Sequence, residues 1–234
     1  MMKQAGFFDV EERLARLSGL GDQLEAFSRT VDFEVFRPNL EKALAYSDGS
    51  KGGRPPFDPV LMFKILVIQT LNNLSDERTE YLINDRLSFM RFLGLGLSDR
   101  VPDAKTVLLF RERLTQAGAI DGLLDKTNTA SSVWADTAYR SKANEDFMEK
   151  QGFVSKVHRK NPHLKPMPRH TQKSNAGKSV IRSRVEHVFA DQKSQTGLFV
   201  RTVGITRATM RIGLANIVYN MRRFLFLQRI STTA

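Results

Sequence analysis

The sequence has 234 residues, ordinary fractions of apolar and charged side chains, no cysteine and a formal net charge of +11 at pH 7. This length allows one large domain or two modest ones, and the lack of cysteine excludes disulfides and thiolate metal sites and fits a reducing compartment. The longest apolar run, residues 60–71, is too short to span a membrane, and the acidic N-terminus does not resemble a signal peptide, so we expect a cytoplasmic protein.

Short helices are predicted throughout the first half of the chain. Amphipathic segments occur within residues 7–46, and a break rich in glycine and proline follows at residues 48–57. Three later helices each begin at a side chain that can accept a hydrogen bond from the first turn, at Asp58, Ser75 and Asp103. An all-helical region of this kind suits a helix-turn-helix-like module, although its composition suits any small helical bundle equally.

The second half of the chain has a different pattern. It predicts a strand, a helix, a second strand, a basic loop broken by prolines and two closing helices, at residues 129–136, 141–152, 153–158, 159–178, 179–194 and 206–229. Strand–helix–strand is typical of a parallel α/β unit, but two strands are too few for a complete sheet of that kind. We therefore expect an α+β fold that is mostly α.

Basic residues are concentrated in the same half. Residues 1–125 carry 16 basic and 19 acidic side chains, whereas residues 126–234 carry 20 basic and 6 acidic ones. So much like charge repels itself unless a polyanion lies against it, and nucleic acid is the commonest polyanion. A basic disordered tail is the alternative, but apolar periodicity continues to Leu227 and argues for a folded segment.

Two carboxylates are candidates for chemistry. Asp136 ends the first predicted strand, where a buried carboxylate is costly unless a metal ion or a cation meets it. Glu186 follows Arg182 by four residues and precedes Lys193 by seven, which places the three side chains on one helical face. One interpretation is a solvated salt bridge, and the other is a metal-bound carboxylate flanked by cations that hold DNA phosphates.

The R-x3-E-x6-K pattern at Arg182, Glu186 and Lys193 resembles the signature around the catalytic glutamate of bacterial insertion-sequence transposases of the DDE class. The segment VWADTAYRS, which contains Asp136, resembles the second aspartate motif of that family, and the N-terminal helices are similar to those of its insertion-sequence-five group. The resemblance implies a helical DNA-binding-like region at residues 1–123 and an RNase-H-like catalytic domain at residues 124–234. The tyrosine of the signature is replaced by Ser179.

The resemblance also implies a mechanism, namely DNA cleavage and strand transfer with Mg²⁺ or Mn²⁺. Asp136 and Glu186 would be catalytic metal ligands, because these hard cations prefer carboxylate oxygens. Arg182 and Lys193 would neutralise the phosphate that is transferred. The partner would be duplex DNA, namely the terminal inverted repeats of the element. The protein itself would be associated with the nucleoid, and homo-oligomerisation is compatible with this function.

One departure from the family is large. The first catalytic aspartate of the family lies on a strand well upstream of the second, and no such strand precedes residues 124–136 here. We infer an internal deletion that leaves the catalytic domain incomplete and the chain inactive by itself, because a two-metal site has lost one ligand. Three functions stay open: an enzyme that cuts and rejoins the ends of its element, a non-catalytic remnant or regulator that binds the terminal repeats, and a product without function.

The densest group of basic residues is predicted to contact DNA phosphates. Three histidines near this group, His158, His163 and His170, suggest a metal site, but their irregular spacing favours a solvated or DNA-facing role. The predicted phosphate contacts, besides Arg182 and Lys193, are Lys156, Arg159, Lys160, Lys165, Arg169, Lys173 and Lys178.

Overall fold

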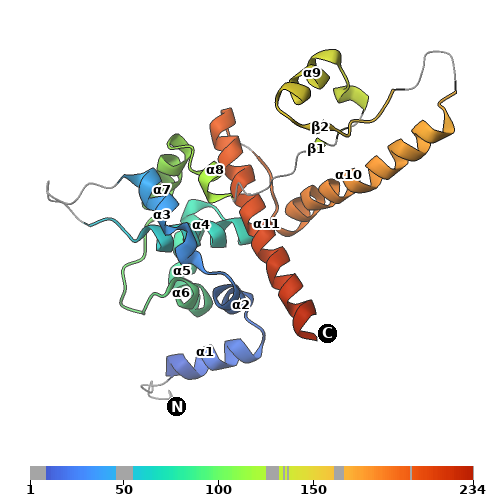
Figure 1. The fold of residues 1–234 in the computed structure, drawn as a ribbon. Coiled ribbons are helices and arrows are strands. Elements are labelled where there is room, and N and C mark those ends of the chain that lie inside the picture. The colour runs from blue at the N-terminus through green and yellow to red at the C-terminus, as the bar shows by residue number, and fades with distance from the viewer. Residues whose placement is uncertain are drawn as a thin grey trace. The chain divides into compact units, whose positions relative to one another are not determined.

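The computed structural model describes residues 9–45, 55–124, 132–133, 135, 137–160, 166–200 and 202–233. The chain packs into two compact units (Figure 1). Unit 1 comprises Met1–Asp125 together with Gln195–Ala234, and unit 2 comprises Lys126–Ser194. The two units are defined by packing alone. The functional division that the sequence predicts between residues 123 and 124 stays a prediction.

The regular elements described in unit 1 are all helices. Its three predicted helix starts are confirmed, because Asp58 accepts from the Leu61 amide at 2.9 Å, Ser75 from Arg78 at 3.1 Å and Asp103 from Thr106 at 2.6 Å. The helices are α1 (Asp9–Gly19), α2 (Gln23–Thr30), η1 (Phe33–Phe36), α3 (Arg37–Leu44), α4 (Pro59–Asn72), α5 (Asp76–Asp85), α6 (Leu87–Leu93), α7 (Ala104–Gln116), α8 (Ile120–Leu123) and α11 (Ile205–Thr233).

The core of unit 1 is built around α4. This helix consists mostly of apolar residues, and its Phe63, Ile65 and Leu66 have no exposed surface. The C-terminal helix α11 packs against α4, α2, α7 and α8, and its Val218 is also fully buried in this core. The C-terminal helix α11, which has 29 residues, therefore completes the apolar core that the N-terminal helices form. Among the described residues, no helix has both the length and the apolar character needed to cross a membrane.

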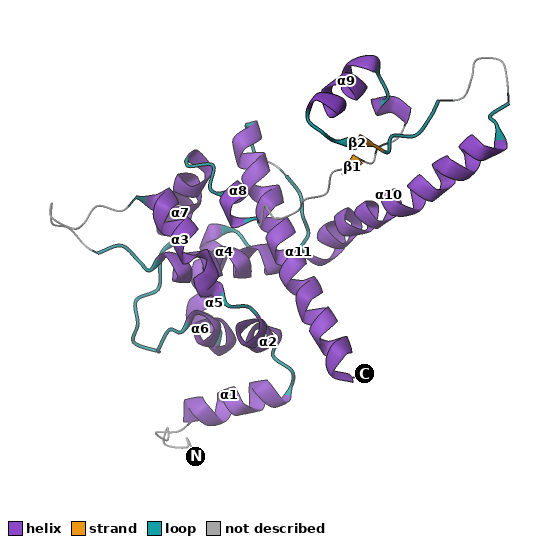
Figure 2. Ribbon diagram, in the orientation of Figure 1, coloured by secondary structure: helices purple, strands orange, loops and turns teal. Residues whose placement is uncertain are grey.

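Unit 2 contains the predicted strand–helix–strand arrangement in a short form. Its elements are β1 (Ser132–Val133), η2 (Thr137–Tyr139), α9 (Lys142–Lys150), β2 (Val154–Ser155) and most of α10 (Arg169–Gln195). The two strands are parallel, with Ser132 opposite Val154 and Val133 opposite Ser155. Figure 2 shows how little strand the described chain contains beside its helices. The prediction of a mostly helical α+β fold with few strands is confirmed.

The predicted loop at residues 159–178 is partly wrong. The helix α10 begins at Arg169 instead of residue 179, directly after Pro168, whose carbonyl accepts a hydrogen bond from the Gln172 amide at 3.0 Å. No proline follows Pro168 in this segment, and a single glycine at Gly177 costs a helix only about 1 kcal/mol. The polar composition of this segment is typical of a loop, but its second part is helical. Arg169, Lys173 and Lys178 therefore lie on α10.

Candidate nucleic-acid interface in unit 2

Asp136, the predicted second catalytic aspartate, lies outside the described residues. The position before it is described, and the Ala135 carbonyl accepts a hydrogen bond from the His158 amide at 3.0 Å. The Val133 carbonyl accepts in the same way from the Lys156 amide at 2.8 Å. The parallel pairing of the two chain segments thus continues beyond β1 and β2 as far as residues 135 and 158.

Glu186 lies on the exposed surface of α10. Its Oε1 is 3.0 Å from Arg182 Nη2, and the side chains of Glu186 and Arg182 are 64% and 34% exposed. Lys193 is also exposed, about two turns further along the same helix. The structure therefore brings Arg182 and Glu186 together as a solvated ion pair between successive turns, which contributes little stability.

The described residues do not provide the divalent-metal site that the resemblance implies. None of them forms a group of three or more histidine, aspartate or glutamate side chains that could hold a metal ion. Glu186 has an arginine as its neighbour, and its oxygens face solvent on a helix surface. The donor set in the described residues therefore does not fit a two-metal centre.

A group of cations gathers near Val157, two residues beyond the end of β2. The Val157 carbonyl accepts hydrogen bonds from Lys178 Nζ at 2.9 Å and from Arg140 Nη1 at 3.2 Å. Burial lowers the pKa of Lys178, and the nearby charges of Arg159, Arg140 and Lys156 lower it further. We call these four residues, Arg140, Lys156, Arg159 and Lys178, the Val157 cluster.

Hydrogen bonds between α10 and the chain segment that follows β2 hold this cluster in place. Asn175 Oδ1 accepts from the Arg159 amide at 3.0 Å, and Asn175 Nδ2 donates to the Arg159 carbonyl at 3.0 Å. One turn further along α10, Ser179 Oγ lies 3.4 Å from His158 Nε2. The residue that replaces the tyrosine of the transposase signature therefore contacts the chain beside the cluster, while the Arg159 side chain remains exposed.

Among the described residues, one carboxylate, Glu145, partly offsets the cluster. Glu145 Oε1 lies 3.8 Å from Arg140 Nη2 and accepts a hydrogen bond from Ser155 Oγ at 2.9 Å. Its charge is the one that raises the pKa of Lys178, against three cations that lower it. The cluster therefore keeps an excess of positive charge, and its donors are of the kind that bind phosphate oxygens.

The structure brings together three of the predicted phosphate contacts, Lys156, Arg159 and Lys178. Arg140 was missed, although it belongs to the VWADTAYRS motif, because it lies 17 positions before Val157 in the sequence and their proximity appears only in the fold. The other predicted contacts lie elsewhere on unit 2 or beyond the described chain. Lys160, Arg169 and Lys173 are exposed residues of the same unit, and Lys165 lies outside the described residues.

Comparison with protein families gives two matches. Residues 11–113 match a family described as a transposase domain (DUF772), and residues 107–221 match the transposase DDE domain. A search of curated proteins and a search of solved structures each found no match. The two family matches are consecutive and together extend over residues 11–221. The chain belongs to the DDE transposases of insertion sequences, which act in DNA transposition and recombination.

Proposed function

We propose that this transposase binds duplex DNA through the Val157 cluster and cannot complete strand transfer by itself. The observation that carries the proposal is the convergence of Lys178 and Arg140 on the Val157 carbonyl, at 2.9 and 3.2 Å, with Lys156 and Arg159 close enough to lower the pKa of Lys178. Four cations gathered in this way repel one another, and a DNA phosphate would relieve that repulsion.

The charge of the whole unit supports a polyanionic partner. Residues 126–194 contain 14 lysine and arginine side chains but only 6 aspartate and glutamate side chains. The charge-assisted contacts of a phosphate would replace like-charge repulsion with attraction, and the released counterions would make binding strongly dependent on salt. Contacts of this type position a protein on DNA without reading its sequence.

The geometry also favours phosphate binding because two of the donors are already held. Arg140 and Lys178 are each fixed by a bond to the same carbonyl, so less side-chain freedom is lost when an anion binds. An arginine presents a planar fork that suits two phosphate oxygens, whereas a lysine acts as a point charge. The pair thus combines orientation from Arg140 with charge from Lys178.

The catalytic part of the proposal rests on the sequence. We take Asp136 and Glu186 as the second and third catalytic carboxylates of a Mg²⁺ or Mn²⁺ site that lacks its first aspartate, with Arg182 and Lys193 as phosphate contacts beside Glu186. We also propose that the chain belongs to the insertion-sequence-five group and has lost an internal segment near residue 124. Its DNA partner would be the terminal inverted repeats of its own element.

A mobility-shift experiment tests DNA binding through the cluster. The Arg159 side chain is exposed and only its backbone is held by Asn175, so Arg159→Gln removes charge without removing those two hydrogen bonds. We expect about tenfold weaker binding to a duplex carrying the element's end, since one charge-assisted contact is lost. The matched control is Lys150→Gln, an exposed cation at the end of α9. Equal affinities for the two variants would contradict the proposal.

A cleavage assay tests the incomplete catalytic site. The purified chain is incubated with Mg²⁺ and a duplex that carries the terminal repeat, and the products are separated on a denaturing gel. We expect binding without cleavage or joining. Cleavage that Asp136→Ala abolishes would show that the chain supplies a complete set of catalytic carboxylates, and the proposed deletion would then be wrong.

A further inference from the structure

Unit 1 contains a cavity of about 590 Å³, which we call the α11 cavity. It is lined by the start of α11, the end of α4, the start of α5, one face of α7 and residues of the segment 196–203. Its volume lies in the range of small-molecule sites in proteins. We call the apolar side chains of its lining the leucine-rich wall, and they are Leu74, Leu108, Leu198, Val203, Met210 and Leu214.

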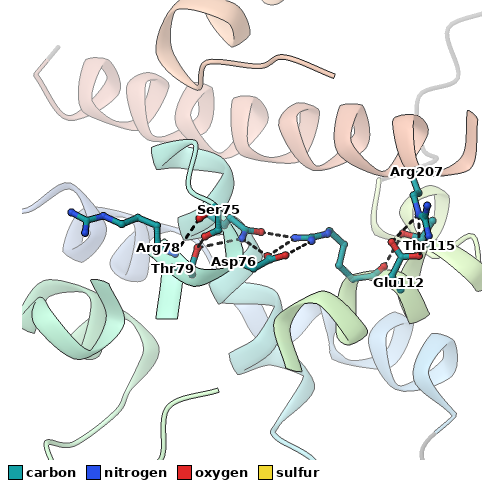
Figure 3. A network of polar contacts seen from close by, with 9 residues as sticks. Ser75, Asp76, Arg78, Thr79, Glu112, Thr115 and Arg207 are labelled. Carbon is teal, nitrogen blue, oxygen red and sulfur yellow. Dashed lines mark hydrogen bonds and ion pairs between the residues drawn. The ribbon is translucent and has the colours of Figure 1, made fainter. Parts of the chain in front are cut away.

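The polar side of the cavity carries arginines that are already paired with carboxylates. Arg111 donates to both oxygens of Asp76, at 2.9 and 2.7 Å, and Gln69 adds a bond to Asp76 at 2.7 Å. Arg207 donates to both oxygens of Glu112, at 3.0 and 2.9 Å (Figure 3). These two guanidinium groups therefore have little capacity left for a ligand.

Arg211 differs from both. Among the described residues, its Nη2 donates one long hydrogen bond, to Asn73 Oδ1 at 3.3 Å, and its buried Nε has no acceptor. Burial and the neighbouring charge of Arg111 hold the pKa of Arg211 below its ordinary value, and they outweigh the opposing charge of Asp76. A partly buried guanidinium whose donors are incompletely used is costly, and an anion from outside would relieve that cost.

We propose that the α11 cavity binds a small amphiphilic anion, with an apolar body against the leucine-rich wall and one carboxylate, sulfonate or phosphate group at Arg211. The remaining charges of the lining favour a single anion over a polyanion. Besides Arg211, the lining holds Arg111 and Arg207 together with three acids, Asp76, Glu77 and Glu112, so it lacks the excess of positive charge that DNA requires. This inference does not depend on DNA binding by unit 2.

Two fluorescent probes separate the anionic group from the apolar body. The first is 8-anilinonaphthalene-1-sulfonate, and the second is N-phenyl-1-naphthylamine, which has a similar aromatic body without the sulfonate. We expect Arg211→Gln to raise the Kd of the sulfonate probe about tenfold and to change the Kd of the neutral probe less than about twofold. Leu108→Gln, at a wall residue that is 42% exposed, should weaken both probes.

The control variant is Arg78→Gln, which removes the same charge from α5 outside the cavity. Arg78 is exposed and lies over the Tyr81 ring, with 4.8 Å from its Cζ to the ring centroid. The Arg78→Gln substitution should leave the Kd values of both probes unchanged. Circular dichroism spectra should match across the variants. Equal sulfonate affinities in Arg211→Gln and the unmodified chain would overturn the proposal. The proposal would also be overturned if duplex DNA displaced the sulfonate probe from the unmodified chain but not from Arg211→Gln. That result would assign the site to DNA.

Discussion

Unit 1 and unit 2 differ in the interactions that stabilise each of them internally. Unit 1 contains a continuous apolar core in which α4 and α11 bury several side chains completely. In the described part of unit 2, the buried apolar side chains are Met148 at 6% exposed and Val157 at 1%. Unit 2 also carries the larger excess of positive charge. Burial therefore stabilises unit 1 without a partner, whereas unit 2 relies on local hydrogen bonds and would gain stability from a bound polyanion.

The largest expected effect is in the core of unit 1. Phe63 has no exposed surface and lies against Phe33 and Phe36, with ring centroids 6.4 and 4.9 Å away. Phe63→Ala should reduce the free energy of unfolding by about 3–5 kcal/mol in a urea titration. Phe147→Ala is the matched control in unit 2, where the ring is 60% exposed and the loss should be much smaller. Similar losses for the two variants would remove the contrast between the units.

The next effect concerns the polar network of α5 and α7. Burial alone would raise the pKa of Asp76, but hydrogen bonds from Arg111 and Gln69 and the charge of Arg111 outweigh it, so this pKa lies below its ordinary value. A lowered pKa gives stability that is complete above the unfolded value of about 3.9 and lost as the pH falls through the folded value. Asp76→Asn should cost about 1–3 kcal/mol at pH 7.

The same variant should lose less stability on acidification than the unmodified chain, because it has no carboxylate to protonate at this position. Urea titrations at pH 7 and at pH 3 provide the comparison. An equally steep decline in both proteins would show that Asp76 does not contribute to the acid sensitivity of unit 1.

A smaller effect is expected where α10 meets the end of β2. Asn175→Ala removes both hydrogen bonds to the Arg159 backbone, which should cost about 1–2 kcal/mol locally. Hydrogen exchange at the Arg159 amide should become faster, while the α4 amides of unit 1 keep their protection. Ser174→Ala, at an exposed neighbouring position, is the control. Unchanged exchange at Arg159 would mean that these bonds do not hold the cluster.

The smallest effect is expected at Glu186. Its ion pair with Arg182 is exposed, so Glu186→Gln should change the free energy of unfolding by less than about 0.5 kcal/mol. Thermal unfolding followed by circular dichroism is sufficient to measure this. A loss above about 2 kcal/mol would show that Glu186 has a structural role that its exposed position does not suggest.

Sequence patterns predicted local features well. Asp58, Ser75 and Asp103 cap helices because a cap depends only on residues within one turn, and the spacing of Arg182 and Glu186 gave their contact for the same reason. The start of α10 was missed because a polar segment can be helical when residues outside the helix stabilise it. Here the Arg159 backbone does so through two hydrogen bonds with Asn175 of α10.

Features that depend on distant parts of the chain were not predictable in this way. Arg140 joins Lys178 only because α9 and β2 bring the chain back beside η2, and Arg211 faces the α11 cavity only because α11 packs on unit 1. Periodicity shows which side of a helix is apolar, but it does not say which other helix covers that side.

The dependence of DNA affinity on salt tests the central claim most directly. If the four cations of the Val157 cluster contact phosphates, the logarithm of the binding constant should fall with the logarithm of salt concentration with a slope of about −3.6 or steeper. Arg159→Gln should reduce the magnitude of this slope by about 1, and Lys150→Gln should not change it. A slope near zero for the unmodified chain would contradict phosphate binding by unit 2.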